Sequence, residues 1–247
     1  MQKRKGEKNL LIIAILGTLI ILGMAFFDRW VFKGDLPPGM VATVPVAADV
    51  QDNESQPTSV SEAEMPSGMP LFEIDPFQSE ARFTLNEVLG GVPTTVVGTT
   101  QQLSGIFAVS LEDPQNAQAG EILIDARNFA TDSSYRNRAI RDRILESSLY
   151  PYIRFVPNEI ITLPEMVSFG ESVSLEISGD LTIKDVTQQV TFTANITPVS
   201  ETEISGHAET MVTYADYGIN IPSVPRVANV DKEVLLEIDF VALLKTE

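Results

Sequence analysis

Side chains that commonly carry out acid–base, nucleophilic or metal chemistry are scarce in this sequence of 247 residues. It contains no cysteine, which excludes disulfides, thiol nucleophiles and thiolate metal sites together. Its single histidine, His207, lies in an alternating segment, where a structural or surface role is far more common than a catalytic dyad. We therefore predict no catalytic residue, no metal site and no cofactor, and composition favours binding or a structural role. An enzyme acting on an apolar substrate would need a buried carboxylate of raised pKa, which no sequence pattern reveals.

Four arginines are concentrated in residues 134–147, a segment with the apolar spacing of a short helix. Arg136, Arg138, Arg141 and Arg143 could form a gate whose guanidinium groups contact a pyrophosphate or quinone head group at the mouth of a cavity. The alternative is a solvated helix that makes ordinary ion pairs. We favour this alternative because the surrounding sequence is acidic.

Acidic residues outnumber basic ones two to one, with 34 Asp and Glu against 17 Lys and Arg, for a net charge of −17. Residues 1–33 hold six basic and two acidic side chains, a charge of +4, so the rest of the chain carries −21. An acidic body of this size repels phosphate backbones, which excludes general nucleic-acid binding. The apolar content of 44% excludes a wholly disordered chain.

The first part of the chain has the pattern of a membrane anchor. Residues 10–27 form an uncharged apolar run that, as a helix, would be about 27 Å long, close to the hydrocarbon thickness of a bilayer. Basic residues precede it in 1–9, so the positive-inside rule predicts a cytoplasmic N-terminus, an uncleaved transmembrane signal anchor and export of the remainder. The alternative is a long cleaved signal peptide. Both interpretations place the body outside the cytoplasm, in the periplasm or the extracellular space.

Two further regions follow the apolar run. Residues 28–70 are rich in proline, serine and acidic residues and have no helical or strand period, so we expect a disordered acidic linker. From 71 to 247 the pattern changes to alternation, as in Val173, Leu175 and Ile177, which predicts strands with one buried and one solvated face. This last region has the length of a single all-β domain.

The number of alternating segments predicts an antiparallel barrel of about eight strands. A closed barrel fits many sequential strands with polar outer faces because it leaves few edges to protect, and a sandwich is the rival architecture. One segment, 134–147, breaks the alternation by placing Ile140 and Ile144 four residues apart, with Pro151 beyond its end. We expect it to form a short helix that lies against the sheet.

A series of short motifs follows in order along the same region. The most specific is GDLTIKDVT at 179–187, which runs into QVTF at 189–192. Weaker ones are FEIDP at 72–76, LSGIF at 103–107, RDRIL at 141–145, YPYIRF at 150–155 and DYGI at 216–219. Their order over residues 71–244 resembles the YceI-like, polyisoprenoid-binding family of lipocalin-like barrels. The resemblance implies a lipocalin-like barrel that encloses a long isoprenoid chain.

The chain departs from this family pattern where polar chemistry would be expected. Gln78 and Ile144 stand where the family often has histidine, so any role that needs an imidazole there is absent. Tyr214 and Ala215 stand where the family has a basic residue. Contacts to a ligand head group are therefore the least transferable part of the resemblance.

An interior lined by Val, Leu, Ile and Phe would accept a hydrocarbon chain, whose burial contributes about 0.8 kcal/mol per CH₂ before ordering costs. We predict that the ligand-binding residues, in the interior or at the mouth of the barrel, are Phe83, Phe107, Val109, Ile140, Ile144, Phe155, Leu175, Ile177, Phe192, Ile238, Phe240 and Arg141. The expected partners are a polyisoprenoid or similar long apolar lipid, held for sequestration or transfer, and the membrane through the N-terminal helix. The alternative is a solid barrel that serves as a structural or adhesion module of the cell envelope.

Overall fold

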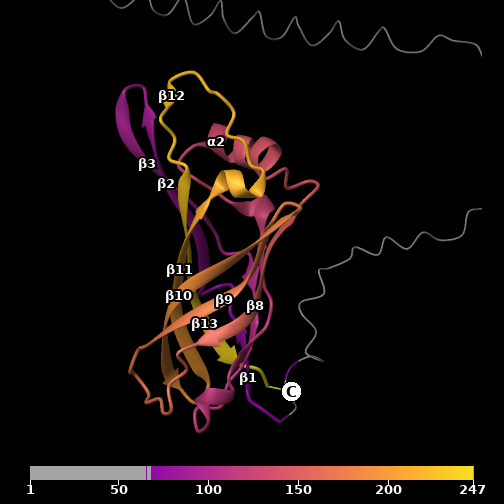
Figure 1. Cartoon of the computed structure of the whole chain (residues 1–247), viewed down its shortest axis with the longest axis vertical. Helices are drawn as coiled ribbons and strands as arrows, with labels where there is room; N and C mark the ends of the chain where they lie inside the picture. The colour runs from indigo at the N-terminus through magenta and orange to yellow at the C-terminus, as the bar shows by residue number, and fades with distance from the viewer. Residues whose placement is uncertain (1–64, 66–67, 247) are drawn as a thin grey trace, which may run out of the picture. The chain divides into compact units, whose positions relative to one another are not determined.

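The computed structural model describes residue 65 and residues 68–246, which Figure 1 shows as a coloured ribbon. The predictions for 1–9 and 10–27, and for nearly all of 28–70, lie outside the described residues. Among the residues that are described, no helix has the length and hydropathy needed to cross a membrane.

The described part of the chain forms one antiparallel sheet of 13 strands, and its long strands alternate between buried and exposed side chains. In the longest strand, for example, Phe192 and Ala194 are buried while Thr191 and Thr193 are exposed. The strands are β1 (Leu71–Ile74), β2 (Glu80–Leu89), β3 (Val92–Thr100), β4 (Leu103–Ser104), β5 (Ile106–Ala108), β6 (Gln118–Ala119), β7 (Ile122–Asp125), β8 (Tyr152–Ile161), β9 (Val173–Ile183), β10 (Val186–Ser200), β11 (Glu203–Thr213), β12 (Val227–Ala228) and β13 (Glu233–Leu244).

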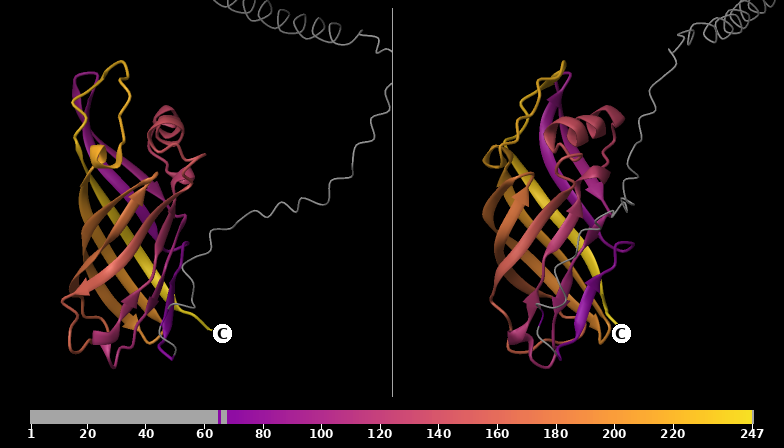
Figure 2. Two further views of the ribbon diagram at one scale, coloured as in Figure 1. Left: turned by 45° about the vertical axis from the view of Figure 1, so that its right-hand side comes forward. Right: turned by 90° about the vertical axis from the view of Figure 1, so that its right-hand side faces the viewer.

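The sheet curls strongly about its own inner face (Figure 2). Its hydrogen-bonded path runs β4-β7-β8-β9-β10-β11-β13-β1-β5-β6, and β2 pairs with β13, β3 and β12. β4 and β5 are separated only by Gly105, so one chain segment contributes to both ends of the path. The Gly105 carbonyl accepts a hydrogen bond from the Ile74 amide at 3.0 Å. The prediction of an all-β antiparallel fold is confirmed as a curled half-barrel made of one sheet. There are more strands than the expected eight because several pairings are only two to four residues long.

The predicted helical insert is present and lies at one end of the sheet, near the β2–β3 hairpin (Figures 1 and 2). Helix α2 (Ser134–Ala139) begins after Ser133, whose hydroxyl accepts a hydrogen bond from the Arg136 amide. It then widens into a π-helical turn, η4 (Ile140–Ile144), closed by a hydrogen bond from the Leu145 amide to the Ile140 carbonyl at 2.8 Å. The wider turn changes which side chains share a flank, so α-helical spacing does not describe the arginines beyond residue 140.

Two strand glycines make room for phenylalanine rings on the inner face. Gly98 is the register partner of Phe83, and Gly206 is the register partner of Phe240. A Cβ atom at Gly206 would lie 2.5 Å from the Phe240 ring and 2.8 Å from the Ile196 side chain, which is closer than real Cβ atoms approach their neighbours. The missing side chains therefore let large rings lie against the neighbouring strand, where the curled sheet leaves little space.

The sheet carries its own core and its own backbone hydrogen bonds. Every strand pairing lies within residues 71–244, and the buried cluster of apolar side chains runs from Phe72 on β1 to Ala242 on β13. Three short 3₁₀ turns complete the connections, η2 (Pro114–Asn116), η3 (Ala126–Asn128) and η5 (Tyr214–Tyr217). A segment with a complete sheet and a contiguous core meets the requirements of an independently folding domain.

We expect the Gly206→Ala variant to lose about 1–3 kcal/mol of unfolding free energy, because the added methyl group overpacks the contact with Phe240. Urea denaturation of residues 65–247 measures this loss. The double variant Gly206→Ala/Phe240→Leu should lose less than the sum of the two single changes, since the smaller side chain relieves the clash. Strictly additive losses would show that the ring and the glycine are not coupled.

Candidate functional site

The curled sheet encloses two cavities that lie end to end along its inner face. The larger, which we name the helix-end cavity, has a volume of about 420 Å³ and is bordered by β2, β13, α2 and η4. The smaller, the distal cavity, has a volume of about 140 Å³ and is bordered by β5, β9, β10 and the loop after β8. The prediction of an interior that could be hollow therefore has a geometric basis.

The helix-end cavity is mostly apolar, and its polar lining residues come from β2, α2 and the turn before it, η5 and β13. Its apolar lining includes Phe83, Leu85, Val96, Ile124, Phe129, Ile140, Ile144, Leu181, Ile183, Leu236 and Ile238. Its polar lining comprises Arg82, Glu87, Asp132, Ser133, Tyr135, Arg136, Tyr214, Tyr217 and Glu237. An apolar lining with a small number of polar groups is the composition expected for a ligand pocket.

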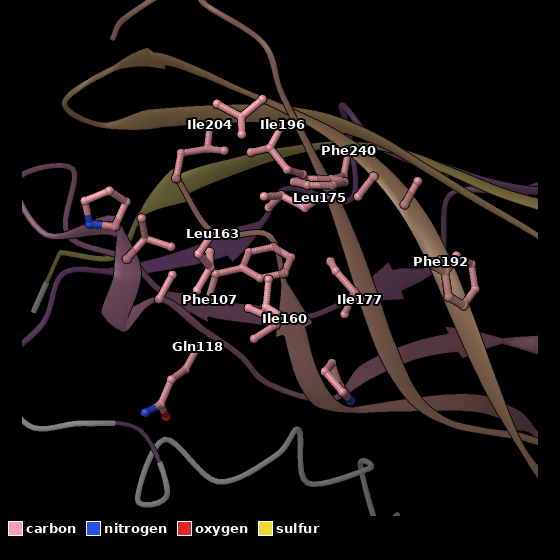
Figure 3. Close-up of a pocket in the computed structure, with 18 of the residues that line it drawn as sticks. Phe107, Gln118, Ile160, Leu163, Leu175, Ile177, Phe192, Ile196, Ile204 and Phe240 are labelled. Carbon is pink, nitrogen blue, oxygen red and sulfur yellow. The ribbon is translucent and has the colours of Figure 1, made fainter. Parts of the chain in front are cut away.

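The distal cavity is lined almost wholly by apolar side chains, and Gln118 is its one polar lining residue within the described part of the chain. Figure 3 shows Phe107, Leu175 and Phe240 among the side chains that surround it, with Leu163 contributed by the loop after β8. A cavity of this composition offers water few polar partners. It is therefore suited to hydrocarbon.

The structure brings eleven of the twelve predicted site residues into the cavity linings. Those lining the distal cavity alone are Phe107, Val109, Leu175, Ile177 and Phe240. Those lining the helix-end cavity alone are Phe83, Ile140 and Ile144. Phe155, Phe192 and Ile238 line both. Arg141 lies in neither lining and is exposed, with its guanidinium 2.8 Å from the Asp142 carboxylate. That these residues contact a ligand remains a prediction.

Some of the lining residues that were not predicted lie outside the alternating segments. Leu163, Pro164 and Val167 come from the loop between β8 and β9, and Pro222 and Val224 come from the loop that precedes β12. Loop residues have no period that marks their inward face. The only available signal was their apolar character next to a strand end.

One ion pair joins the helix to the sheet beside the helix-end cavity. The Arg136 guanidinium on α2 lies 2.8 Å from the Glu87 carboxylate on β2, and it also pairs with Asp132. The side chains of Arg136 and Glu87 are only 18% and 8% exposed. A carboxylate buried to this degree requires its cationic partner. Arg136 and Arg141 both make ordinary ion pairs with carboxylates. That they act as a gate for a ligand head group stays a prediction.

Tyr217 supplies an unusual group near the same cavity. Its hydroxyl is the one buried side-chain polar atom without a hydrogen-bond partner among the described residues. Burial, together with the nearby Asp216 carboxylate, raises the pKa of the Tyr217 hydroxyl to about 12. The hydroxyl is therefore neutral at physiological pH and retains its proton.

His207 lies on the face of β11 opposite to Ala208, which lines the distal cavity. Its Nδ1 atom lies 2.7 Å from Oδ1 of Asp239, its register partner on β13. The hydrogen bond to Asp239 raises the pKa of the His207 imidazole against the opposing effect of burial. Asp239 also pairs with Arg82 on β2, so His207 belongs to a cross-strand ion-pair network. His207 and Asp239 line neither cavity, whereas Arg82 borders the helix-end cavity.

Comparison with known proteins places this geometry in a family. The family model described as the YceI-like domain matches residues 72–242. The chain belongs to the YceI-like family. A search of curated proteins found no match.

Among solved structures, the YceI-like domain of this chain is similar to a polyisoprenoid binding domain from Saccharophagus degradans that is implicated in plant cell wall breakdown. The two share 17% sequence identity, with a TM-score of 0.54. The alignment covers 70% of this chain and 98% of that one. It is also similar to BcnA from Burkholderia cenocepacia, with 19% identity over 68% and 98% of the two chains and a TM-score of 0.49. At 17% identity, the likeness to the Saccharophagus degradans domain shows a shared fold alone.

The two positions where the YceI-like family often has histidine lie in different surroundings. Gln78 is exposed in the turn before β2, where its side-chain amide donates to the Asp75 carboxylate at 2.7 Å. Ile144 lines the helix-end cavity. The second replacement therefore makes the cavity more apolar than an imidazole would.

We expect Arg136→Ala to lower the unfolding free energy by about 3 kcal/mol, because it leaves the buried Glu87 carboxylate unpaired. The matched control is Arg141→Ala, whose ion pair with Asp142 is exposed, and its loss should stay below about 1 kcal/mol. Urea denaturation of both variants compares the two losses. Equal losses would mean that the Arg136–Glu87 pair does not hold the helix to the sheet.

The raised pKa of His207 predicts a pH-dependent contribution to stability. A group whose pKa is raised by folding contributes fully below its unfolded pKa of about 6.5, and this contribution is lost as the pH rises through the folded value. The unfolding free energy of the natural protein should therefore exceed that of His207→Gln by more at about pH 5.5 than at about pH 9. A difference that does not change with pH would contradict this linkage.

Proposed function

We propose that this protein is a membrane-anchored, extracytoplasmic binding protein that encloses a polyisoprenoid or a similar long apolar lipid in its β-barrel. It acts by sequestration or transfer, and no bond of the lipid is broken. The observation that carries the proposal is the apolar helix-end cavity of about 420 Å³ inside a YceI-like domain. A related structure is described as a polyisoprenoid binding domain, which supports the same class of ligand.

The physical support comes from the lining. The walls of both cavities are provided mainly by Phe, Leu, Ile and Val side chains. Each CH₂ group of a ligand buried against them contributes about 0.8 kcal/mol before ordering costs. The charged residues of the helix-end lining are held in ion pairs: Arg136 pairs with Glu87 and Asp132. Arg82 pairs with Glu237. A neutral hydrocarbon chain therefore fits this interior better than an ion does.

The proposal of binding without catalysis follows from the distribution of titratable groups. His207 belongs to a network on the opposite side of its strand from the cavity lining, and Glu87 is held as an ion pair by Arg136. The neutral Tyr217 hydroxyl is a donor and an acceptor of hydrogen bonds rather than a base at physiological pH. None of these groups has the arrangement of a nucleophile activated by a base.

The anchoring and the location rest on the sequence of the first part of the chain. The uncharged run at 10–27, preceded by basic residues, supports a single span with its N-terminus in the cytoplasm. The linker at 28–70 would then let the barrel reach the membrane surface from outside the cytoplasm. The two cavities inside the domain favour this proposal over the alternative of a solid structural barrel.

We expect residues 65–247 to co-purify with an apolar lipid, identified by organic extraction and mass spectrometry. The variant Leu236→Trp, which fills the helix-end cavity from β13, should carry less than about half as much lipid. The matched control is Val156→Trp, an equally large residue at an exposed position on β8, which should carry as much lipid as the unchanged domain. A domain that is repeatedly free of lipid, and that takes up no added prenol, would refute the proposal.

A further inference from the structure

The two cavities adjoin at a small group of side chains that belong to both linings. Phe155, Phe192 and Ile238 are the residues shared by the helix-end and distal cavities. The rings of Phe155 and Phe192 meet edge to face, with their centroids 4.8 Å apart. This ring pair therefore stands between the larger space and the smaller one.

The contact between the two rings depends on a glycine in the strand between them. Phe155 lies on β8 and Phe192 on β10, and β9 separates these strands. Gly179 on β9 has no side chain, and a Cβ atom there would lie 2.7 Å from the Phe155 ring. Rings from the two flanking strands can meet only because the inner face of β9 is bare at this position. The glycine in the GDLTIKDVT motif thus has a direct role in dividing the interior.

The ring pair is built into the core. Phe155 and Phe192 are 7% and 5% exposed. The Phe155 ring lies against Gly179, so it cannot move further toward β9. Displacing either ring would sacrifice the edge-to-face contact and apolar packing on both sides. A ligand chain that enters the helix-end cavity therefore meets a barrier at its far end.

The cavity volumes indicate how many isoprene units fit on each side of the ring pair. A cavity of about 150 Å³ accepts benzene, which is close in size to one five-carbon isoprene unit. The distal cavity of about 140 Å³ thus has room for one unit, and the helix-end cavity of about 420 Å³ has room for three.

We propose that the Phe155–Phe192 pair, closed over Gly179, limits the bound chain to the helix-end cavity and selects a prenyl chain of about three isoprene units. The inference rests on the proposed lipid-binding function and adds a specificity-determining element to it. Additional units of a longer chain stay outside the enclosed space and add little to the affinity.

The test uses residues 65–247, freed of bound lipid, and four prenols of increasing length: geraniol, farnesol, geranylgeraniol and a five-unit homologue. Displacement of a fluorescent apolar probe measures each affinity. For the unchanged domain the affinity should rise from geraniol to farnesol, and the fourth unit should then change it by less than about twofold. In Phe192→Ala the fourth unit should strengthen binding by roughly tenfold, because it gains access to the distal cavity.

The matched control is Phe240→Ala, which removes the same ring from the wall of the distal cavity but leaves the ring pair in place. Its affinity should still level off at three units. Phe192→Leu provides a milder change should the alanine variant not fold, and the fourth unit should then strengthen binding by more than it does in the unchanged domain. The chain-length series of the unchanged domain is itself a test that needs no variant.

The outcomes separate the two proposals. If the unchanged domain binds none of the prenols, the proposed function fails. If it binds farnesol but its affinity keeps rising through the longer chains, the ring pair is no barrier and only the inference fails. The inference also fails if the Phe192 variants keep the same length profile as the unchanged domain while binding farnesol.

Discussion

The curvature of the sheet is the constraint on which the rest of the structure depends. When a sheet curls this strongly, side chains on its inner face crowd together, and large rings fit only where a neighbouring strand lacks a side chain. Gly98, Gly179 and Gly206 each supply such a gap, and each lies against a phenylalanine ring. The rings in turn determine where the interior is filled and where it is hollow. The position of the cavities therefore follows from three glycines as much as from the apolar residues that line them.

The charged groups divide into two arrangements with different consequences. On β11, β13 and β2, the side chains of His207, Asp239 and Arg82 form a cross-strand network. These side chains are partly exposed, so each ion pair contributes little to the stability of the fold. At the helix, the pair between Arg136 and Glu87 is largely buried, and the loss of one partner leaves an uncompensated charge. This pair thus links the helix to the sheet between residues 49 apart in sequence, in addition to the packing of the buried Ile140.

Much of the fold could be predicted from the sequence, because alternation reports directly on which face of a strand is buried. It identified eleven residues of the cavity linings and the short helix, although it could not show that the helix ends in a π-helical turn at Ile140. The pairing of Arg136 with Glu87 was not predictable, since it depends on where β2 passes the helix. The alternation of apolar and polar residues also did not show whether the interior is solid or hollow. That property depends on how Phe155 and Phe192 meet over Gly179, and a residue's inward direction does not reveal its neighbours across the sheet.

The hollow interior has an energetic consequence that favours a ligand. Apolar walls of the helix-end cavity that stay in contact with water cost the protein the roughly 25 cal/mol per Å² that their burial would contribute. Filling the space with side chains would have been the simpler solution for a purely structural barrel. A ligand that binds only the folded state offsets the cost in proportion to the logarithm of its concentration over its dissociation constant. The stability of this domain and its occupancy by an apolar chain are therefore expected to be thermodynamically linked.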